Sequence, residues 1–125
     1  MIEQAIAVTN NKMAADKLEG KMEVIYIDGT LMDVLKISRD YIHKGHRLLT
    51  HPLSGSVKPN ETPYKTILIS KFNGKTIDVD SLSIIEYSIH TCEKLLKNKT
   101  TPRWPQKILD DFKLIDFDLI YNAIN

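Results

Sequence analysis

The stretch QAIAVTNNKMAADKLEGKMEVIYI, residues 4–27, decides the fold class. Its apolar runs QAIAVT (4–9) and VIYI (24–27) are short, rich in β-branched residues and bounded by turn-forming residues, a pattern typical of strands buried on both faces. The segment between them predicts a short helix that begins at one of the two adjacent asparagines and ends at Gly20. A strand, a helix and a second strand in this order predict a βαβ unit, and hence an α/β fold.

A second helix follows in DGTLMDVLKISRDYIHKG, residues 28–45. Thr30 is suited to cap its first turn, Asp33 stands at capping-box spacing, and Gly45 follows its last turn. One face of this helix carries the apolar stripe that a helix covering a sheet needs. We expect that stripe to contain Leu31, Val34, Leu35, Tyr41 and Ile42.

Two more apolar runs complete the predicted sheet. RLLT (47–50) predicts a third strand and TILIS (66–70) a fourth. The connection between them has no helical pattern, whereas a parallel crossover normally contains a helix, so we expect the fourth strand to run antiparallel. The prediction is a small three-layer α/β domain with about four strands, mostly parallel, and helices on both faces.

The remainder of the chain predicts a helical C-terminus. DSLSIIEYSIHTCEKLLKNK (80–99) has the spacing of a long helix, and QKILDDFKLIDFDLIYNAI (106–124) continues as one kinked or two short helices. Trp104, between two prolines, could plug the edge of the sheet or offer a partner-binding surface, and we favour the plug because one aromatic residue is a weak sign of an interface. Four aspartates are interpreted as solvated helix faces: Asp110, Asp111, Asp116 and Asp118. We expect residues 1–125 to form a single domain.

Composition excludes several classes of function. The 125 residues carry 17 basic and 16 acidic side chains, interspersed along the chain, and no basic stripe of a nucleic-acid surface. No stretch approaches the length of a membrane span, and the first residues do not resemble a signal peptide. The single cysteine, Cys92, fits a reducing compartment and the apolar stripe of its helix. We therefore expect a cytoplasmic protein that contacts neither membrane nor nucleic acid.

The polar segment HPLSGSVKPNETPYK, residues 51–65, is the best candidate for a binding loop. In open α/β sheets, ligands bind beyond the carboxyl ends of the strands, where this loop and two polar turns are expected to converge. We interpret the segment as binding a partner or a small phosphorylated or carboxylated metabolite. The alternative is a surface loop whose polar groups satisfy one another. The candidate binding residues are Asn10, Asn11, Asp28, His51, Ser54, Gly55, Ser56, Lys58, Asn60, Glu61, Thr62 and Lys65.

A catalytic role would rest mainly on His51. This residue could act as a general base, or it could be a loop anchor bonded to backbone. A Ser54–His51 nucleophile pair, oriented by Asp28 or Glu61, is a further alternative, but neither a phosphate loop nor a nucleophile elbow is present. We expect no metal site, because His46 and His51 would lie roughly 16 Å apart on an extended strand. No cofactor is expected either.

The block YIHKGHRLLTHPLSGSVKPNETPYKTILIS, residues 41–70, together with VTNN (8–11), resembles the GrdX family. These small proteins are encoded with the components of glycine, sarcosine and betaine reductases in amino-acid-fermenting anaerobes. The resemblance covers most of the chain and implies a link to that reductase system. It brings no catalytic residues to carry over. The chain also has no C-x-x-C pair, which a redox component would need.

Three functions follow from these observations. The leading one is a non-enzymatic accessory protein that binds a reductase component or aids its assembly. The second is a domain that binds a small anion, and the third is a small enzyme that acts on such a metabolite, with His51 as its acid–base group.

Overall fold

The computed structural model, which describes residues 3–55 and 58–124, contains a small sheet and four helices. The elements are β1 (Ala5–Thr9), α1 (Lys12–Leu18), β2 (Glu23–Tyr26), α2 (Leu31–His43), β3 (Thr66–Ser70), α3 (Val79–Asn98) and α4 (Gln106–Ile124). The strand order is β2-β1-β3, with β1 parallel to β2 and antiparallel to β3. The α/β prediction is confirmed, but the sheet has three strands and is mixed, rather than four-stranded and mostly parallel.

The segment RLLT (47–50) is not a full strand, although it lies along β3. It pairs with β3 through a single antiparallel bridge, Leu48 to Ile69. Two backbone hydrogen bonds flank this bridge, from Ser70 N to Arg47 O at 2.8 Å and from Leu49 N to Leu68 O at 2.9 Å. On each side the next N–H group bonds to a side-chain hydroxyl instead, because Arg47 N donates to Ser70 Oγ at 2.8 Å and Leu68 N donates to Thr50 Oγ1 at 3.0 Å. Ser81 Oγ accepts from Leu48 N at 2.9 Å. The strand prediction failed because the apolar pattern of RLLT does not show where such hydroxyl partners lie.

The antiparallel direction of TILIS is confirmed, and it determines where the long loop ends. Thr9, the last residue of β1, pairs with Thr66, the first residue of β3. The loop that precedes Thr66 therefore arrives at the carboxyl end of β1. The predicted strand VIYI differs from expectation in another way, because β2 is an edge strand with half-buried and exposed side chains rather than one buried on both faces.

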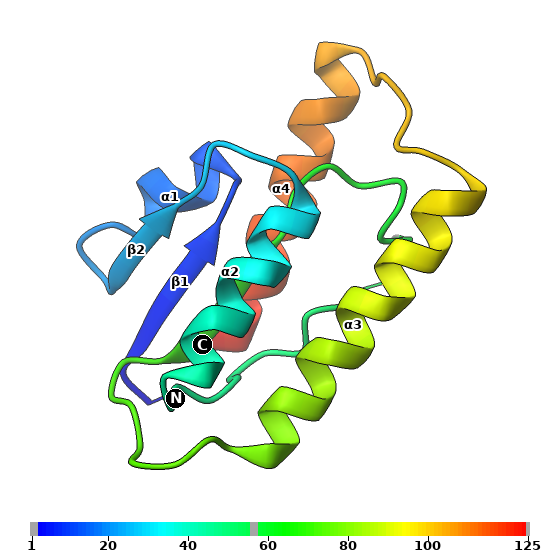
Figure 1. Ribbon diagram of the computed structural model, residues 1–125. Helices are drawn as coiled ribbons and strands as arrows, with labels where there is room; N and C mark the ends of the chain where they lie inside the picture. Colours follow the sequence, from blue (N-terminus) through cyan, green and yellow to red (C-terminus); the bar gives the residue numbers. More distant parts are fainter. Residues whose placement is uncertain (1–2, 56–57, 125) are drawn as a thin grey trace.

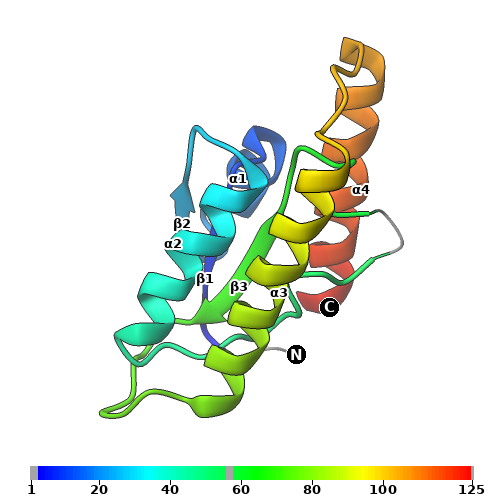
Figure 2. The same cartoon turned by 45° about the vertical axis from the view of Figure 1, so that its right-hand side comes forward.

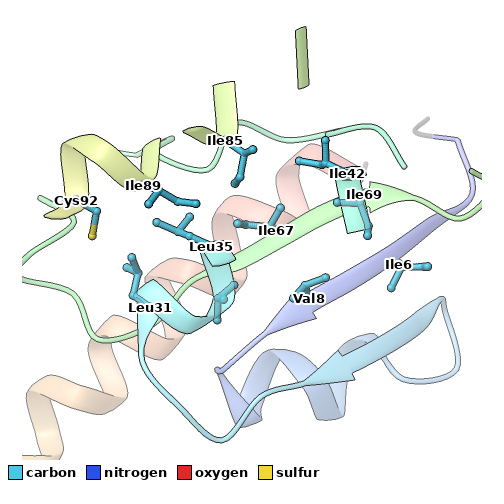
Figure 3. Close-up of a cluster of buried hydrophobic side chains, with 11 residues drawn as sticks. Ile6, Val8, Leu31, Leu35, Ile42, Ile67, Ile69, Ile85, Ile89 and Cys92 are labelled. Atoms are coloured by element: carbon cyan, nitrogen blue, oxygen red, sulfur yellow. The ribbon is translucent and has the colours of Figure 1, made fainter. Parts of the chain in front are cut away.

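Helices cover both faces of the sheet, which makes the three predicted layers. Figures 1 and 2 show α2 and α3 on one face, with α1 and α4 on the other. Side chains alternate along the strands, so each face receives its own cluster. The larger cluster, between the sheet and α2 and α3, includes isoleucines from β1 and β3 (Figure 3). Each fully buried isoleucine or leucine contributes about 1.5–3 kcal/mol to folding.

The second cluster lies between the sheet and α1 and α4. Its strand residues are smaller, with Ala5 and Ala7 from β1 beside Leu68 from β3. Ile120 is the buried residue that α4 contributes, and Phe117 and Ile124 of the same helix pack against the cluster. The small side chains of β1 bring the sheet near the C-terminal helix.

The ends of the helices lie close to the positions predicted from the sequence. Asn11 caps α1, and Thr30 with Asp33 forms the predicted capping box at the start of α2. Gly45, after α2, has φ +104°, which glycine adopts without strain. The segment 106–124 forms one helix, α4, rather than two short ones. Within the described residues, no helix is both long and apolar enough to cross a membrane.

Candidate functional site

A buried carboxylate, Asp116 of α4, lies at the carboxyl end of β1. Its side chain is 5% exposed and accepts three hydrogen bonds. Thr66 N donates to Oδ1 at 2.9 Å, while Thr66 Oγ1 at 2.6 Å and Asn11 Nδ2 at 3.0 Å donate to Oδ2. The interpretation of Asp116 as solvated was wrong, because it lies one turn before Ile120 on the buried face of α4. Asp110, Asp111 and Asp118 are exposed.

Asn11 joins three elements at this end of the sheet. Its Oδ1 caps α1 by accepting from Met13 N at 3.1 Å and Ala14 N at 3.4 Å. Its Nδ2 donates to Lys113 O of α4 at 2.9 Å as well as to Asp116. One fully buried side chain thus caps a helix and attaches the C-terminal helix to the end of β1.

Asn10 attaches two loops to the end of β1, as Asn11 attaches α1 and α4. Its Nδ2 donates to Gly29 O at 3.0 Å and to Pro63 O at 2.8 Å, and its Oδ1 accepts from Lys65 N at 2.9 Å. The turn after β2 and the end of the 51–65 loop therefore meet at the end of β1, as the strand-end argument led us to expect.

Lys65 is buried at the junction of the loop and the sheet. The residue is 7% exposed, and its Nζ donates to Ser54 O at 3.0 Å. Burial lowers the pKa of the Lys65 amine, and the negative charge of Asp116 partly offsets this effect. The side chain ties the two ends of the loop together across eleven residues.

A small cavity of about 30 Å³ lies between this loop and α4. Lys65 and Asp116 are the charged residues of its lining, and most of the remaining wall is apolar. The cavity has room for roughly two water-sized groups. Its apolar lining includes Leu31, Pro52, Leu53, Pro59, Phe112, Ile115 and Leu119.

Residues between α3 and α4 form hydrogen bonds with the middle of the 51–65 loop. Asn60 is buried and its Nδ2 donates to Lys99 O at 3.2 Å, while Thr62 Oγ1 donates to Tyr64 O at 3.3 Å. Trp104 Nε1 donates to Glu61 O at 2.7 Å, and its ring lies 5.5 Å from that of Phe112. Trp104 therefore packs between the loop and α4 rather than plugging the edge of the sheet.

Several predicted residues are exposed, although Ser54 contributes its backbone oxygen to the buried Lys65. Asp28, Lys58, Ser54 and Gly55 are exposed. His51 is exposed too, and its Nδ1 accepts from Leu53 N at 3.1 Å, which is the backbone-anchor alternative. No hydrogen bond joins the side chains of His51 and Ser54 in the described part of the chain. Ser56 lies outside the described residues.

Metal or thiol chemistry would need histidine, cysteine or acidic side chains in particular arrangements. Residues 3–55 and 58–124 contain no group of three or more histidine, cysteine or acidic side chains placed to hold a metal ion. Cys92 lies in the larger core cluster, where burial raises the pKa of its thiol. A protonated, buried thiol is a poor nucleophile.

Three residues of the network were not identified from the sequence, namely Asp116, Thr9 and Thr66. Thr9 Oγ1 and Thr66 Oγ1 lie 2.7 Å apart, at the facing ends of β1 and β3. The available signal was the apolar spacing of α4, in which Asp116 falls between Phe112 and Ile120 at steps of four residues.

Comparison with known proteins adds a family to this geometry. Searches of curated proteins and of solved structures found no significant match. A family model described as GrdX-like protein matches residues 6–125, which is nearly the whole chain. This chain therefore belongs to the GrdX-like protein family.

Proposed function

We propose that this protein is a non-enzymatic, cytoplasmic accessory protein of a glycine, sarcosine or betaine reductase system, and that it binds a protein component of that system. Family membership supports the link to the reductase system. The observation that carries the binding role is a group of exposed aliphatic side chains on α4, which we call the α4 surface. Its members are Leu114, Ile115 and Leu119, exposed to 46%, 44% and 36%.

The charges around the α4 surface define the partner. Asp111 and Asp118 of the same helix are exposed and lie within a turn of Leu114 and Ile115. Aliphatic groups flanked by carboxylates complement an apolar segment that carries lysine or arginine, and such charge pairs guide association. The partner segment that fits is therefore apolar and basic.

A non-enzymatic role agrees with how the polar groups are used. The three hydrogen bonds to Asp116 all come from the protein itself, and His51 Nδ1 is held by the backbone of its own loop. A general base needs free access to a substrate proton. These groups instead hold the loop and α4 in place beside the exposed face.

Binding to purified components of the reductase system tests this function. Titration calorimetry would compare the wild-type protein with Leu114→Arg, which puts a bulky positive charge into the α4 surface. The matched control is Val79→Arg, since Val79 is 72% exposed on α3, which covers the other face of the sheet. We expect Leu114→Arg to weaken binding at least tenfold and Val79→Arg to leave it unchanged.

Salt provides the second arm of this test. Because the partner segment is basic, raising the ionic strength should slow association of the wild-type protein. If no purified component binds the wild-type protein, the accessory function is wrong. If Leu114→Arg binds as well as Val79→Arg, the α4 surface is not the contact.

A further inference from the structure

Lys65 is a buried lysine in the lining of the cavity beneath the 51–65 loop, and the residue is 7% exposed. Among the described residues, Ser54 O is the hydrogen-bond partner of its Nζ, at 3.0 Å. A lysine ammonium has three donors, so most of its hydrogen-bonding capacity is left for a molecule in the cavity.

The charges of the cavity select against an anion. Asp116 shares the lining with Lys65, and its carboxylate offsets the positive charge of the amine. A ligand carboxylate or phosphate would lie near this second negative charge and would give up its hydration to an apolar wall. The phosphorylated or carboxylated metabolite expected from the sequence therefore does not suit this cavity. An uncharged ligand with a hydrogen-bond acceptor does.

The surroundings of Lys65 also favour the form of the amine that reacts with carbonyl groups. Burial lowers the pKa of Lys65, which increases the fraction of neutral amine at a given pH. Neutral amine is the nucleophilic form, and a desolvated lysine in an apolar pocket is the arrangement in which lysine forms Schiff bases.

We propose that Lys65 binds a small uncharged carbonyl compound, a short aliphatic aldehyde or ketone, as an imine. Nζ forms a bond to the carbonyl carbon, and the carbonyl oxygen takes up a proton from nitrogen, giving a carbinolamine. The carbinolamine then loses its oxygen as water, with a second proton from nitrogen, and the C=N bond forms. The step is a condensation, so no oxidant or reductant takes part.

The size of the cavity limits the carbonyl compound. A volume of about 30 Å³ accommodates roughly two water-sized groups around the amine. Gly55 lies at the wall, where an added Cβ would meet Leu119 Cδ1 at 2.9 Å. Leu119 therefore already closes the space beside Gly55, which limits the carbonyl compound to a short chain. Ligands as small as acetaldehyde, propanal and acetone meet this limit.

Reductive trapping of the wild-type protein tests the proposal without any variant. The protein would be incubated with propanal and sodium cyanoborohydride at pH 7, and alkylation of each lysine followed by peptide mass spectrometry. We expect Lys65 to be alkylated at least tenfold faster than the exposed Lys21 and Lys75. Alkylation of Lys65 at or below the rate of these two would overturn the proposal. Protection of Lys65 by propionate would also overturn it, because an anion would then occupy the cavity.

A pair of variants shows whether the cavity is responsible. Leu119→Trp adds bulk at the lining, whereas Leu114→Trp adds the same bulk on α4 away from it. We expect Leu119→Trp to slow alkylation of Lys65 at least tenfold and Leu114→Trp to leave it unchanged, with Lys21 and Lys75 reacting equally in both. Equal rates at Lys65 in the two variants would contradict capture in the cavity.

Ile115 and Leu119 belong to both the α4 surface and the cavity lining, whereas Leu114 belongs to the α4 surface alone. Failure of the imine proposal is therefore judged by alkylation of Lys65, and failure of the accessory function by binding of the wild-type protein to purified reductase components.

Discussion

At the scale of single residues, Asp116 determines how the end of the sheet is built. It is a carboxylate from the last helix that satisfies a strand N–H, a threonine hydroxyl and an asparagine amide. Hydrogen bonds to a charged group are the stronger kind, and removing their acceptor leaves buried donors without partners.

We predict that Asp116→Ala lowers the free energy of unfolding by about 3 kcal/mol, because three buried donors lose their acceptor. Asp118→Ala is the matched control on the same helix. Asp118 is exposed, so its loss should change the free energy by less than about 0.5 kcal/mol. Urea unfolding followed by circular dichroism measures both. Similar values for the two variants would contradict the network described here.

The lowered pKa of Lys65 makes the stability of the folded protein depend on pH. Burial places its pKa in the folded state below the ordinary value of 10.5, so the unfolded chain binds more protons between these two values. Stability therefore rises with pH in that window and is lowest below the lowered pKa. Relative to Lys65→Met, the wild-type protein should gain stability as pH increases toward 10.5. Urea unfolding of both proteins between neutral pH and pH 10.5 tests this prediction. A difference in unfolding free energy between wild type and Lys65→Met that does not vary with pH would contradict it.

Residue roles that depend on neighbours in sequence were predictable, and those that depend on distant ones were not. The capping box of Thr30 and Asp33 spans three residues and was predicted. The role of Asp116 depends on Thr66 and Asn11, which lie 50 and 105 residues away in sequence. An aspartate on an amphipathic helix is normally solvated, and only packing against the sheet reverses that expectation.

At the scale of elements, the same distinction separates β3 from RLLT. The strand TILIS and its antiparallel direction followed from its apolar pattern and from the missing crossover helix. RLLT has a similar pattern, but Ser70 and Ser81 bind its backbone N–H groups. Local pattern therefore predicted where extended chain would occur, but not how much of it would join the sheet.

The backbone conformation of Gly45, just after α2, allows a test of the packing there. Its φ is +104°, and an added Cβ would collide with the backbone oxygen of Gly74. We expect Gly45→Ala to destabilise the protein by about 3 kcal/mol, combining strain with a clash that a fixed backbone cannot relieve. Gly20→Ala is the control, with φ +91° and no heavy atom within 4 Å, so it should cost about 1 kcal/mol. Thermal denaturation of both variants measures the difference, and equal losses would show that the Gly74 contact is not tight.

At the scale of the whole molecule, the two core clusters share the strands β1 and β3. Residues of β1 alternate between the clusters, with Ala5 and Ala7 in one and Ile6 and Val8 in the other. If either helical layer separated from the sheet, residues of β1 and β3 would become exposed to water. The same strands support the other helical layer, which would lose that support. We therefore propose that the chain is one cooperative domain.

Scanning calorimetry tests this proposal. We expect a single transition in which the calorimetric and van't Hoff enthalpies agree, as for most single domains of this size. Loss of α4 ahead of the rest, seen as two transitions or as a calorimetric enthalpy larger than the van't Hoff value, would contradict it.

The hydrogen bonds of Asp116 also have a consequence for synthesis on the ribosome. Asn11 and Thr66 are translated well before residue 116, so the donors at the end of the sheet stay hydrated in the nascent chain until α4 emerges. The 51–65 loop packs against that same helix, and its final position is reached only then. Because chains fold from the N-terminus during translation, the cavity that holds Lys65 is completed only after α4 has emerged from the ribosome.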